Sequence, residues 1–385
     1  MRSSKKSNSR KRIALSALFA LAAFTCLVSA LVTIPKGPTK LAVNAERGAS
    51  GGRMTLRAPA TLADLIALEP ARLARCDVAL MNLLCAQGLR GAENLNVADC
   101  LAALDQWAGR VRFETERHLY RFRQTPGEYD HSEAKFRMLM LGMSLQNDFR
   151  ISYNPERIRP AGEFEPNDAF FGDSRDVFLH GLLTDRRMGT CSSLPVLYVA
   201  VGRRLGYPLK LVETKAHVFV RWEDARERFN IEASGRGVGW YDDEHFKRRP
   251  IPVTDEEIAA CGFLKSLTAQ QELGMFLSIR GHCLMAMGEA AEAVAAHEQA
   301  LRLQPDSWVQ QAMLTGARQE LENKKRQSKP RAAGTGAERM IADGKLMEGR
   351  PEFLSFDRDK TLPGTDRRPE DGLGPGMKPN KQGGP

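Results

Sequence analysis

Residues 188–208 read MGTCSSLPVLYVAVGRRLGYP, and this stretch decides how the centre of the chain folds. Apolar side chains recur in it at helical spacing: Leu194, Leu197, Tyr198, Val201 and Leu205. Pro195 is compatible with the first helical turn, where the N–H that proline lacks would have no intrahelical partner. Gly206 and Pro208 then end the helix. The pattern predicts a helix from about Leu194, with Cys191 at or just before its N-terminus.

Three short strand-like runs follow this helix, namely Leu209–Glu213, His217–Trp222 and Arg228–Glu232. His217 opens the second run and Glu232 closes the third. Asn230 lies two residues before Glu232, so both side chains are expected on the same face of a strand. The chain therefore places a cysteine at a helix start, a histidine on a strand, and an amide or carboxylate on the next strand.

This order suits nucleophilic catalysis by a thiol. A helix N-terminus and a neighbouring imidazolium both lower the pKa of a thiol, which favours the thiolate at working pH. His217 would form that ion pair with Cys191 and then protonate the leaving group. A partner on the other ring nitrogen fixes its tautomer and orientation, and Glu232 or Asn230 can serve. Taken singly, Cys191 or His217 would be assigned to packing; their joint arrangement favours catalysis.

The run at 217–234, HVFVRWEDARERFNIEAS, resembles the pattern of the transglutaminase-like superfamily, which belongs to the papain-like cysteine enzymes. The shared features are a histidine, an aromatic residue two positions later, a hairpin turn and an acidic end. YNPERI at 153–158 and the segment 173–209 are similar to a bacterial branch of that superfamily. In that branch a helical segment precedes the core, and tetratricopeptide repeats often follow it. The resemblance covers roughly 70–320 and is specific over 173–235.

The resemblance implies a catalytic role for three positions. Cys191 would be the nucleophile, His217 the general base and acid, and Glu232 the third member. Glu232 replaces the aspartate usual in the family, so Asn230 is the alternative third member. No acidic cluster resembles the calcium sites of animal transglutaminases, so neither a metal nor a cofactor is expected. Other residues with chemical capacity lack a supporting arrangement and are interpreted as structural: Cys261, Cys283, His245 and His282.

The expected fold class is α+β, with a papain-like, transglutaminase-type core, a helical N-terminal region and a C-terminal helical hairpin. Within 274–307 the small and proline positions match one tetratricopeptide repeat: Gly281, Leu284, Gly288, Ala293, Ala300 and Pro305. A plain helical hairpin is the alternative. Composition and periodicity divide the chain as follows: 1–34 signal-anchor or signal peptide, 35–60 linker, 61–150 helical N-terminal region, 151–255 core, 265–322 tetratricopeptide-like helices and 323–385 disordered tail.

Residues 13–34, IALSALFALAAFTCLVSALVTI, carry no charged residue and are long enough to span a bilayer as a transmembrane helix. Basic residues precede this run and favour an N-terminus inside the cytoplasm, which places the body outside it. A cleaved signal peptide is the alternative, because Val28-Ser29-Ala30 is a passable cleavage site. The protein is therefore expected to be anchored in the membrane with its body in the periplasm or at the cell surface, or to be secreted.

Export would place the cysteines in an oxidising space, where one disulfide among Cys76, Cys85 and Cys100 is expected. A Cys85–Cys100 bridge is favoured, because the polar loop between these residues joins two helical patterns. The equally weighted alternative is that all three are small buried apolar residues.

The net charge of +9 is concentrated at the two ends of the chain, and the body is near neutral. An electrostatic footprint for DNA or RNA needs a basic face on the folded part, so nucleic acid is not an expected partner. Hydrophobic residues make up 42% and charged residues 27%, which is ordinary for a globular protein. This composition excludes a collagen, a fully disordered chain and a multi-span membrane protein.

These observations predict a transglutaminase-like cysteine acyl-transfer enzyme, a peptidase or amidase that acts through a thioester on a protein or peptide substrate. Hydrolysis is favoured over transfer to an amine, because water is always available and an amine acceptor needs its own site. One alternative is a catalytically inactive binding or scaffold protein of the cell envelope, with a protein partner on the tetratricopeptide-like hairpin. Another is a purely structural envelope protein.

Overall fold

The computed structural model describes residues 58–158, 169–184, 186–235 and 237–328. The predicted signal-anchor or signal peptide (1–34), nearly all of the predicted linker (35–60) and residues 329–385 of the predicted tail lie outside the described residues. Among the helices of the described ranges, none combines the length and the apolar character that a membrane crossing requires.

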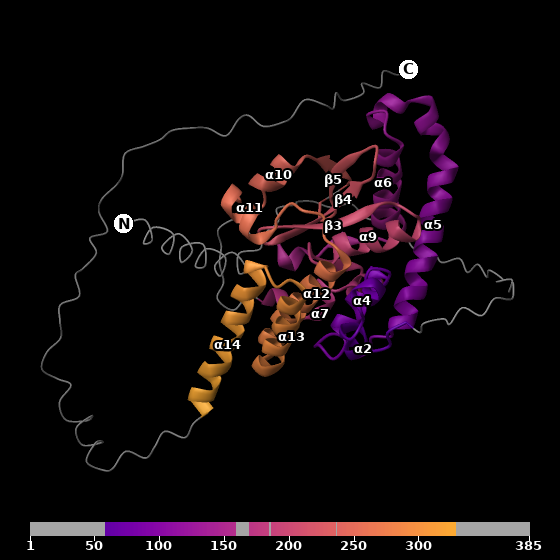
Figure 1. Cartoon of the computed structure of the whole chain (residues 1–385). Helices are drawn as coiled ribbons and strands as arrows, with labels where there is room; N and C mark the ends of the chain where they lie inside the picture. Colours follow the sequence, from indigo (N-terminus) through magenta and orange to yellow (C-terminus); the bar gives the residue numbers. More distant parts are fainter. Residues whose placement is uncertain (1–57, 159–168, 185, 236, 329–385) are drawn as a thin grey trace, which may run out of the picture. The chain divides into compact units, whose positions relative to one another are not determined.

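The described chain begins with helices, as the periodicity predicts. They are α2 (Leu62–Ile66), α3 (Pro70–Leu73), α4 (Val78–Ala86), α5 (Val97–Gln124) and α6 (Glu133–Met143), followed by the single turns η1 (Pro126–Tyr129) and η2 (Ser144–Asp148) at the ends of α5 and α6. Asn96 caps α5, because its side chain accepts hydrogen bonds from the N–H groups of Ala98 and Asp99. Helix α4 is buried along its whole length, whereas α5 runs along one side of the molecule (Figure 1).

A four-stranded antiparallel sheet forms the centre, in the order β3 (Leu209–Thr214), β4 (His217–Glu223), β5 (Arg228–Glu232) and β6 (Gly239–Tyr241). The three strands predicted from sequence are confirmed to within one residue at each end. A two-residue turn, Lys215-Ala216, joins β3 to β4, with Ala216 at a φ of 56°. Helix α9 (Leu194–Arg204) packs against β3 and β4 on one face. Phe246 of α10 (Asp243–Arg248) stacks on Phe219 on the other face.

Two short strands form a second, parallel sheet just before α9. β1 (Ser152–Tyr153) pairs in parallel with β2 (Met188–Gly189). Between them lie the short turns η3 (Pro155–Arg157) and η4 (Ala169–Phe171) and the short helices α7 (Ser174–Val177) and α8 (Leu179–Leu183). The mixture of helices and a small sheet fits the predicted α+β class.

Gly181→Ala is expected to destabilise the protein by about 1–3 kcal/mol, the usual range for overpacking. A Cβ added at Gly181 would overlap the backbone carbonyl of Arg175, so the backbone of α7 or α8 must shift. Chemical denaturation measures the change, and Gly109→Ala on α5, where a Cβ meets nothing, is the matched control. Equal free energies of unfolding for the two variants would contradict this account.

The C-terminal helices are α11 (Asp255–Cys261), α12 (Ala269–Met287), α13 (Ala290–Leu303) and α14 (Trp308–Ser328). Helices α12 and α13 pack against each other as a hairpin; its description as a tetratricopeptide-type repeat stays a prediction. Arg203 of α9 pairs with buried Glu272 of α12 at 2.5 Å. Arg280 of α12 donates to the carbonyls of Cys85 and Gln87 beside α4. These contacts fasten the hairpin to the rest of the protein.

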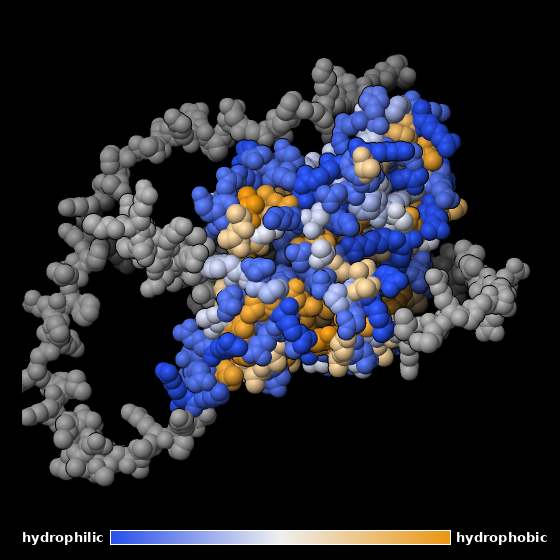
Figure 2. Space-filling model, viewed as in Figure 1, coloured by the Kyte–Doolittle hydropathy of each residue, from blue (hydrophilic) through white to orange (hydrophobic). Residues whose placement is uncertain are grey.

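The predicted start of the tail at Asn323 is wrong, because α14 continues to Ser328. Apart from Asn323, residues Gln319–Lys325 are good helix formers, and Glu322 pairs with Lys325 three positions later, which supports the last turns. Figure 2 shows that this C-terminal end of α14 is hydrophilic, whereas hydrophobic residues reach the surface over the α12–α13 region.

The predicted Cys85–Cys100 disulfide is also wrong, since both residues are thiols. Cys85 is fully buried in α4 within the main core, and Cys100 packs at the edge of that core on α5. Burial raises the pKa of the Cys85 thiol to about 12. Cys85 therefore is a small buried residue of the core, as the alternative interpretation of these cysteines held.

Candidate functional site

Cys191 lies in the tight turn that leads into α9, two residues before the N-cap, Ser193. The N–H of Leu194 already bonds to the carbonyl of Thr190 at 2.9 Å, so the turn continues directly into the helix. The Cys191 side chain is fully buried. The sequence prediction placed Cys191 at or just before this helix start, and the structure locates it there. Backbone N–H groups at a helix start favour an anion, which suits a thiolate.

Asp176 of α7 holds this turn in place. Its backbone carbonyl accepts hydrogen bonds from the hydroxyls of Thr190 (3.0 Å) and Ser193 (2.9 Å), on either side of Cys191. Its carboxylate is 0% exposed and pairs with two guanidinium groups, those of Arg157 and Arg186. The amide of Asn154 donates a further bond of 2.8 Å to the same carboxylate. The turn is thereby fixed to a buried charged cluster that the sequence interpretation did not identify.

His217 and Glu232 form a direct pair across the sheet. Nε2 of His217 lies 2.7 Å from Oε2 of Glu232, and the other carboxylate oxygen accepts a bond of 2.7 Å from the N–H of Ser234. Burial acts to raise the pKa of Glu232, but the charge of His217 and the bonds from His217 and Ser234 hold it below its ordinary value. Glu232 thus orients the ring through Nε2, so a proton exchange between His217 and a thiol would have to use Nδ1.

Asn230, the alternative third member, is engaged elsewhere on the same face. Its Oδ1 accepts a bond of 2.7 Å from Nε of Arg221, and its amide donates to Asp243 at 2.8 Å. Arg221 also pairs with Asp243 at 2.7 Å. The geometry therefore brings Glu232, and not Asn230, to His217.

Tyr153 is a residue of this site that the sequence interpretation missed. Its hydroxyl lies 3.9 Å from Sγ of Cys191. The parallel pairing of β1 with β2 sets Tyr153 opposite Gly189, two residues before Cys191. Tyr153 opens the YNPERI stretch noted above for its resemblance to the bacterial branch, but no local pattern indicates that this stretch pairs beside the cysteine turn.

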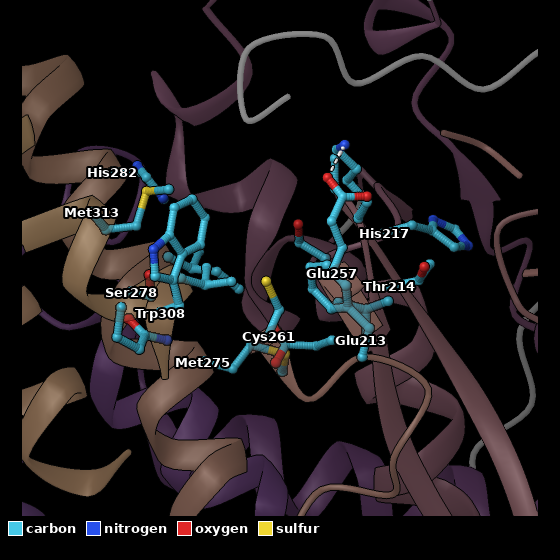
Figure 3. A pocket seen from close by; sticks show the side chains of 18 of the residues that line it. Glu213, Thr214, His217, Glu257, Cys261, Met275, Ser278, His282, Trp308 and Met313 are labelled. Carbon is cyan, nitrogen blue, oxygen red and sulfur yellow. Dashed lines mark hydrogen bonds and ion pairs between the residues drawn. The ribbon is translucent and has the colours of Figure 1, made fainter. Parts of the chain in front are cut away.

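The turn that holds Cys191 and the strand that begins with His217 border one pocket. Ser192, the residue after Cys191, and His217 both line a pocket of about 120 Å³ beside the sheet. Figure 3 shows His217, Thr214 and Glu213 on the strand side of this pocket and Trp308, Met313 and Ser278 on the helix side. Two residues that the sequence interpretation assigned to structure, Cys261 and His282, also line it. Trp222 and Tyr198 do not line this pocket and belong to the main hydrophobic core.

Glu232→Gln is expected to lower the rate of Cys191 acylation about ten- to hundredfold. A hydrogen bond to a charged group contributes about 1.5–3 kcal/mol, and 1.36 kcal/mol is about tenfold in rate. Because the folded pKa of Glu232 is lowered, the ionised carboxylate stabilises the fold above the ordinary glutamate pKa of about 4.3. The stability difference between wild type and variant, measured by urea unfolding, should shrink as the pH falls below that value and disappear once the pH passes below the lowered folded pKa of Glu232. A difference that persists in acid would rule out this role of the charge.

No group of three or more histidine, cysteine, aspartate or glutamate side chains is arranged to hold a metal ion in the part of the chain that the structure describes.

Comparison with known families gives one match. Residues 98–248 match the transglutaminase-like superfamily, so this part of the chain is a transglutaminase-like domain. The match begins in α5 and ends in α10, and it includes Cys191, His217 and Glu232. It takes in α5 and α6, which the sequence interpretation assigned to a separate N-terminal region, and leaves α11–α14 outside. No curated protein and no solved structure matches the chain.

Proposed function

We propose that this protein, with its transglutaminase-like domain at residues 98–248, is a cysteine acyl-transfer enzyme that acts as a peptidase or amidase through a thioester. The observation that carries the proposal is the bond of 2.7 Å between His217 and Glu232, beside the pocket that Ser192 and His217 share. A histidine held by a carboxylate, on a pocket that also reaches the residue after a cysteine at a helix start, is an arrangement suited to covalent catalysis.

In the proposed reaction, Nδ1 of His217 takes the proton of the Cys191 thiol, and Sγ attacks the carbonyl carbon of an amide. The developing oxyanion would accept a hydrogen bond from the Tyr153 hydroxyl, which lies 3.9 Å from Sγ. His217 then gives its proton to the leaving amine as the C–N bond breaks, and a thioester remains. Water, deprotonated by His217, attacks the thioester and releases the carboxylic acid and the thiol. Glu232 stabilises the imidazolium in both halves of the cycle.

A second candidate function, a catalytically inactive binding protein, is favoured by one observation. Cys191 is 0% exposed, so a substrate carbonyl reaches Sγ only if the residues over it move. In this alternative the same pocket would hold a ligand without covalent chemistry.

A generic acyl donor separates the two functions. We expect p-nitrophenyl acetate to transfer its acetyl group to Sγ of Cys191 with release of p-nitrophenolate, and the thioester to be located by peptide mass spectrometry after acid quenching. Cys283, which is buried in α12, serves as an internal control for unfolding. Acetylation of Cys191 that is lost in His217→Ala supports the enzyme. Absence of any acyl-Cys191 in the folded protein would leave the binding function.

The site of action is proposed to lie outside the cytoplasm, on the basis of the basic N-terminus and the apolar run at 13–34. The C-terminal hairpin is proposed to contact a protein partner. Protease digestion of sealed, right-side-out membrane vesicles carrying the full chain tests the location. A body that resists digestion until detergent is added would contradict it.

A further inference from the structure

The pocket beside His217 has two unlike walls. The helix wall comes from α12 and α14, and its side chains are mainly apolar: Met275, Ile279, Trp308, Val309 and Met313, with Phe171 of η4 next to them. The strand wall comes from the β3–β4 hairpin and carries Glu213, Lys215 and His217. Figure 3 shows these two walls facing each other, with Cys261 between them. Because α12 and α14 lie outside the matched residues 98–248, this pocket is formed jointly by the matched domain and the helices that follow it.

Glu213 is the unusual group in this pocket. Its carboxylate forms no hydrogen bond or ion pair with any residue in the described ranges, whereas the nearby Glu257 is paired with Lys215 at 2.7 Å. Burial raises the pKa of Glu213 to about 7. Ionising a carboxylate in the wall of an apolar pocket costs free energy when no hydrogen-bond donor or cation contacts it. A ligand that brings such a group would remove that cost.

The other titratable groups that line the pocket do not supply that donor. Burial lowers the pKa of His282 to about 3, so this ring is neutral. Burial raises the pKa of the Cys261 thiol to about 11, so it is uncharged as well. Lys215 is held by Glu257 on α11, and His217 is held by Glu232. Among the described residues that line the pocket, Glu213 is therefore the charged group that lacks an opposite charge.

We propose that this pocket binds an alkyl group that ends in an ammonium, with the alkyl part against Met275, Trp308 and Met313 and the ammonium at Glu213. The volume of about 120 Å³ is close to that of an apolar cavity of about 150 Å³ that accommodates benzene, so a chain of about six heavy atoms fits. The assignment of this group as a side chain of the peptide or amide substrate rests on the proposed function, because Ser192 and His217 line the same pocket. The binding itself does not depend on catalysis.

The test uses hexylamine and hexanol as probes on the folded full chain, with binding measured by calorimetry and by the fluorescence of Trp308. We expect hexylamine to bind at least about tenfold more tightly than hexanol at pH 8. That preference should shrink as the pH falls through 7, because Glu213 becomes protonated, while the amine stays charged. In Glu213→Gln the preference and its pH dependence should both vanish, and hexanol binding should remain. Glu256→Gln, which changes an exposed residue of α11 outside the pocket, is the matched control and should behave as wild type.

Equal binding of the two probes, or an amine preference that survives in Glu213→Gln, would overturn the proposal. If Glu213→Gln fails to fold, the pH dependence in the wild-type protein decides, since a flat profile between pH 6 and 8 also overturns it. Cys191→Ala should bind hexylamine as wild type does. If the amine binds but Cys191 is not acylated, the proposed enzymatic function fails and the proposed ammonium site stands. If Cys191 is acylated but the amine does not bind, the enzymatic function stands and the ammonium site fails.

Discussion

His217→Ala is expected to slow the alkylation of Cys191 by iodoacetamide about a hundredfold at pH 6.5, and hardly at all above pH 9. The thiolate is the reactive form, and an ordinary thiol with a pKa of about 8.5 is only about one hundredth ionised at pH 6.5. A thiol paired with an imidazolium at a helix start is ionised already at that pH, so removing the ring removes most of the thiolate. Above pH 9 both proteins hold thiolate, and the rates converge. Rates at Cys191 are followed by peptide mass spectrometry across this pH range.

The burial of Cys191 makes an internal reference necessary, because any reagent needs a local opening to reach Sγ. Cys85 and Cys283 are equally buried in α4 and α12, and burial raises the pKa of each thiol to about 12. They report global unfolding in the same sample. Labelling of Cys191 well before these two shows that the site opens locally. Identical pH profiles in wild type and His217→Ala would mean that no activated pair exists, and the inactive binding protein would then be the better account.

Local sequence patterns predicted the elements that carry the site. Helical spacing after Cys191 predicted α9, and the runs that open with His217 and close with Glu232 predicted β4 and β5. These elements follow one another closely along the chain, and tight turns join the strands. Their pairing therefore follows from periodicity and from the residues of the turns. The choice between Glu232 and Asn230 did not follow, because both face the same side of β5. Only the position of Arg221 opposite Asn230 in the β4–β5 pairing removes Asn230 from the choice.

Contacts between distant segments could not be predicted in this way. Tyr153 reaches the cysteine turn through the parallel pairing of β1 and β2, which lie 36 positions apart in register. Glu213 faces α12 and α14 across the pocket, and nothing in the β3 pattern indicates that a charged residue there has no partner. The disulfide prediction failed for the same reason: the loop between Cys85 and Cys100 suggested a bridge, but Cys85 is buried inside the main core, Cys100 packs at its edge, and both are thiols.

Asp176→Asn is expected to lower the free energy of unfolding by about 3–5 kcal/mol, the range for breaking a buried ion pair from one side. Asp176 is 0% exposed, and the two guanidinium groups that it neutralises, those of Arg157 and Arg186, are themselves mostly buried. The substitution keeps the shape of the side chain, so no cavity forms. It leaves Arg157 without its counter-charge and leaves Arg186 with the longer contact of 3.7 Å to Asp173, in a site that water enters poorly. Urea unfolding at pH 7 measures the change.

Asp173→Asn is the matched control, because Asp173 precedes the same helix and asparagine is an equally good N-cap. Its ion pair with Arg175 is partly exposed and its contact with Arg186 is long, at 3.7 Å, so this variant should lose less than about 1 kcal/mol. The backbone carbonyl of Asp176 also receives the hydroxyls of Thr190 and Ser193. A displaced α7 should therefore loosen the turn around Cys191 and speed its alkylation in conditions where Cys85 stays unlabelled. Similar stabilities for the two variants, or an unchanged labelling rate at Cys191, would show that the charged cluster does not hold the nucleophile in position.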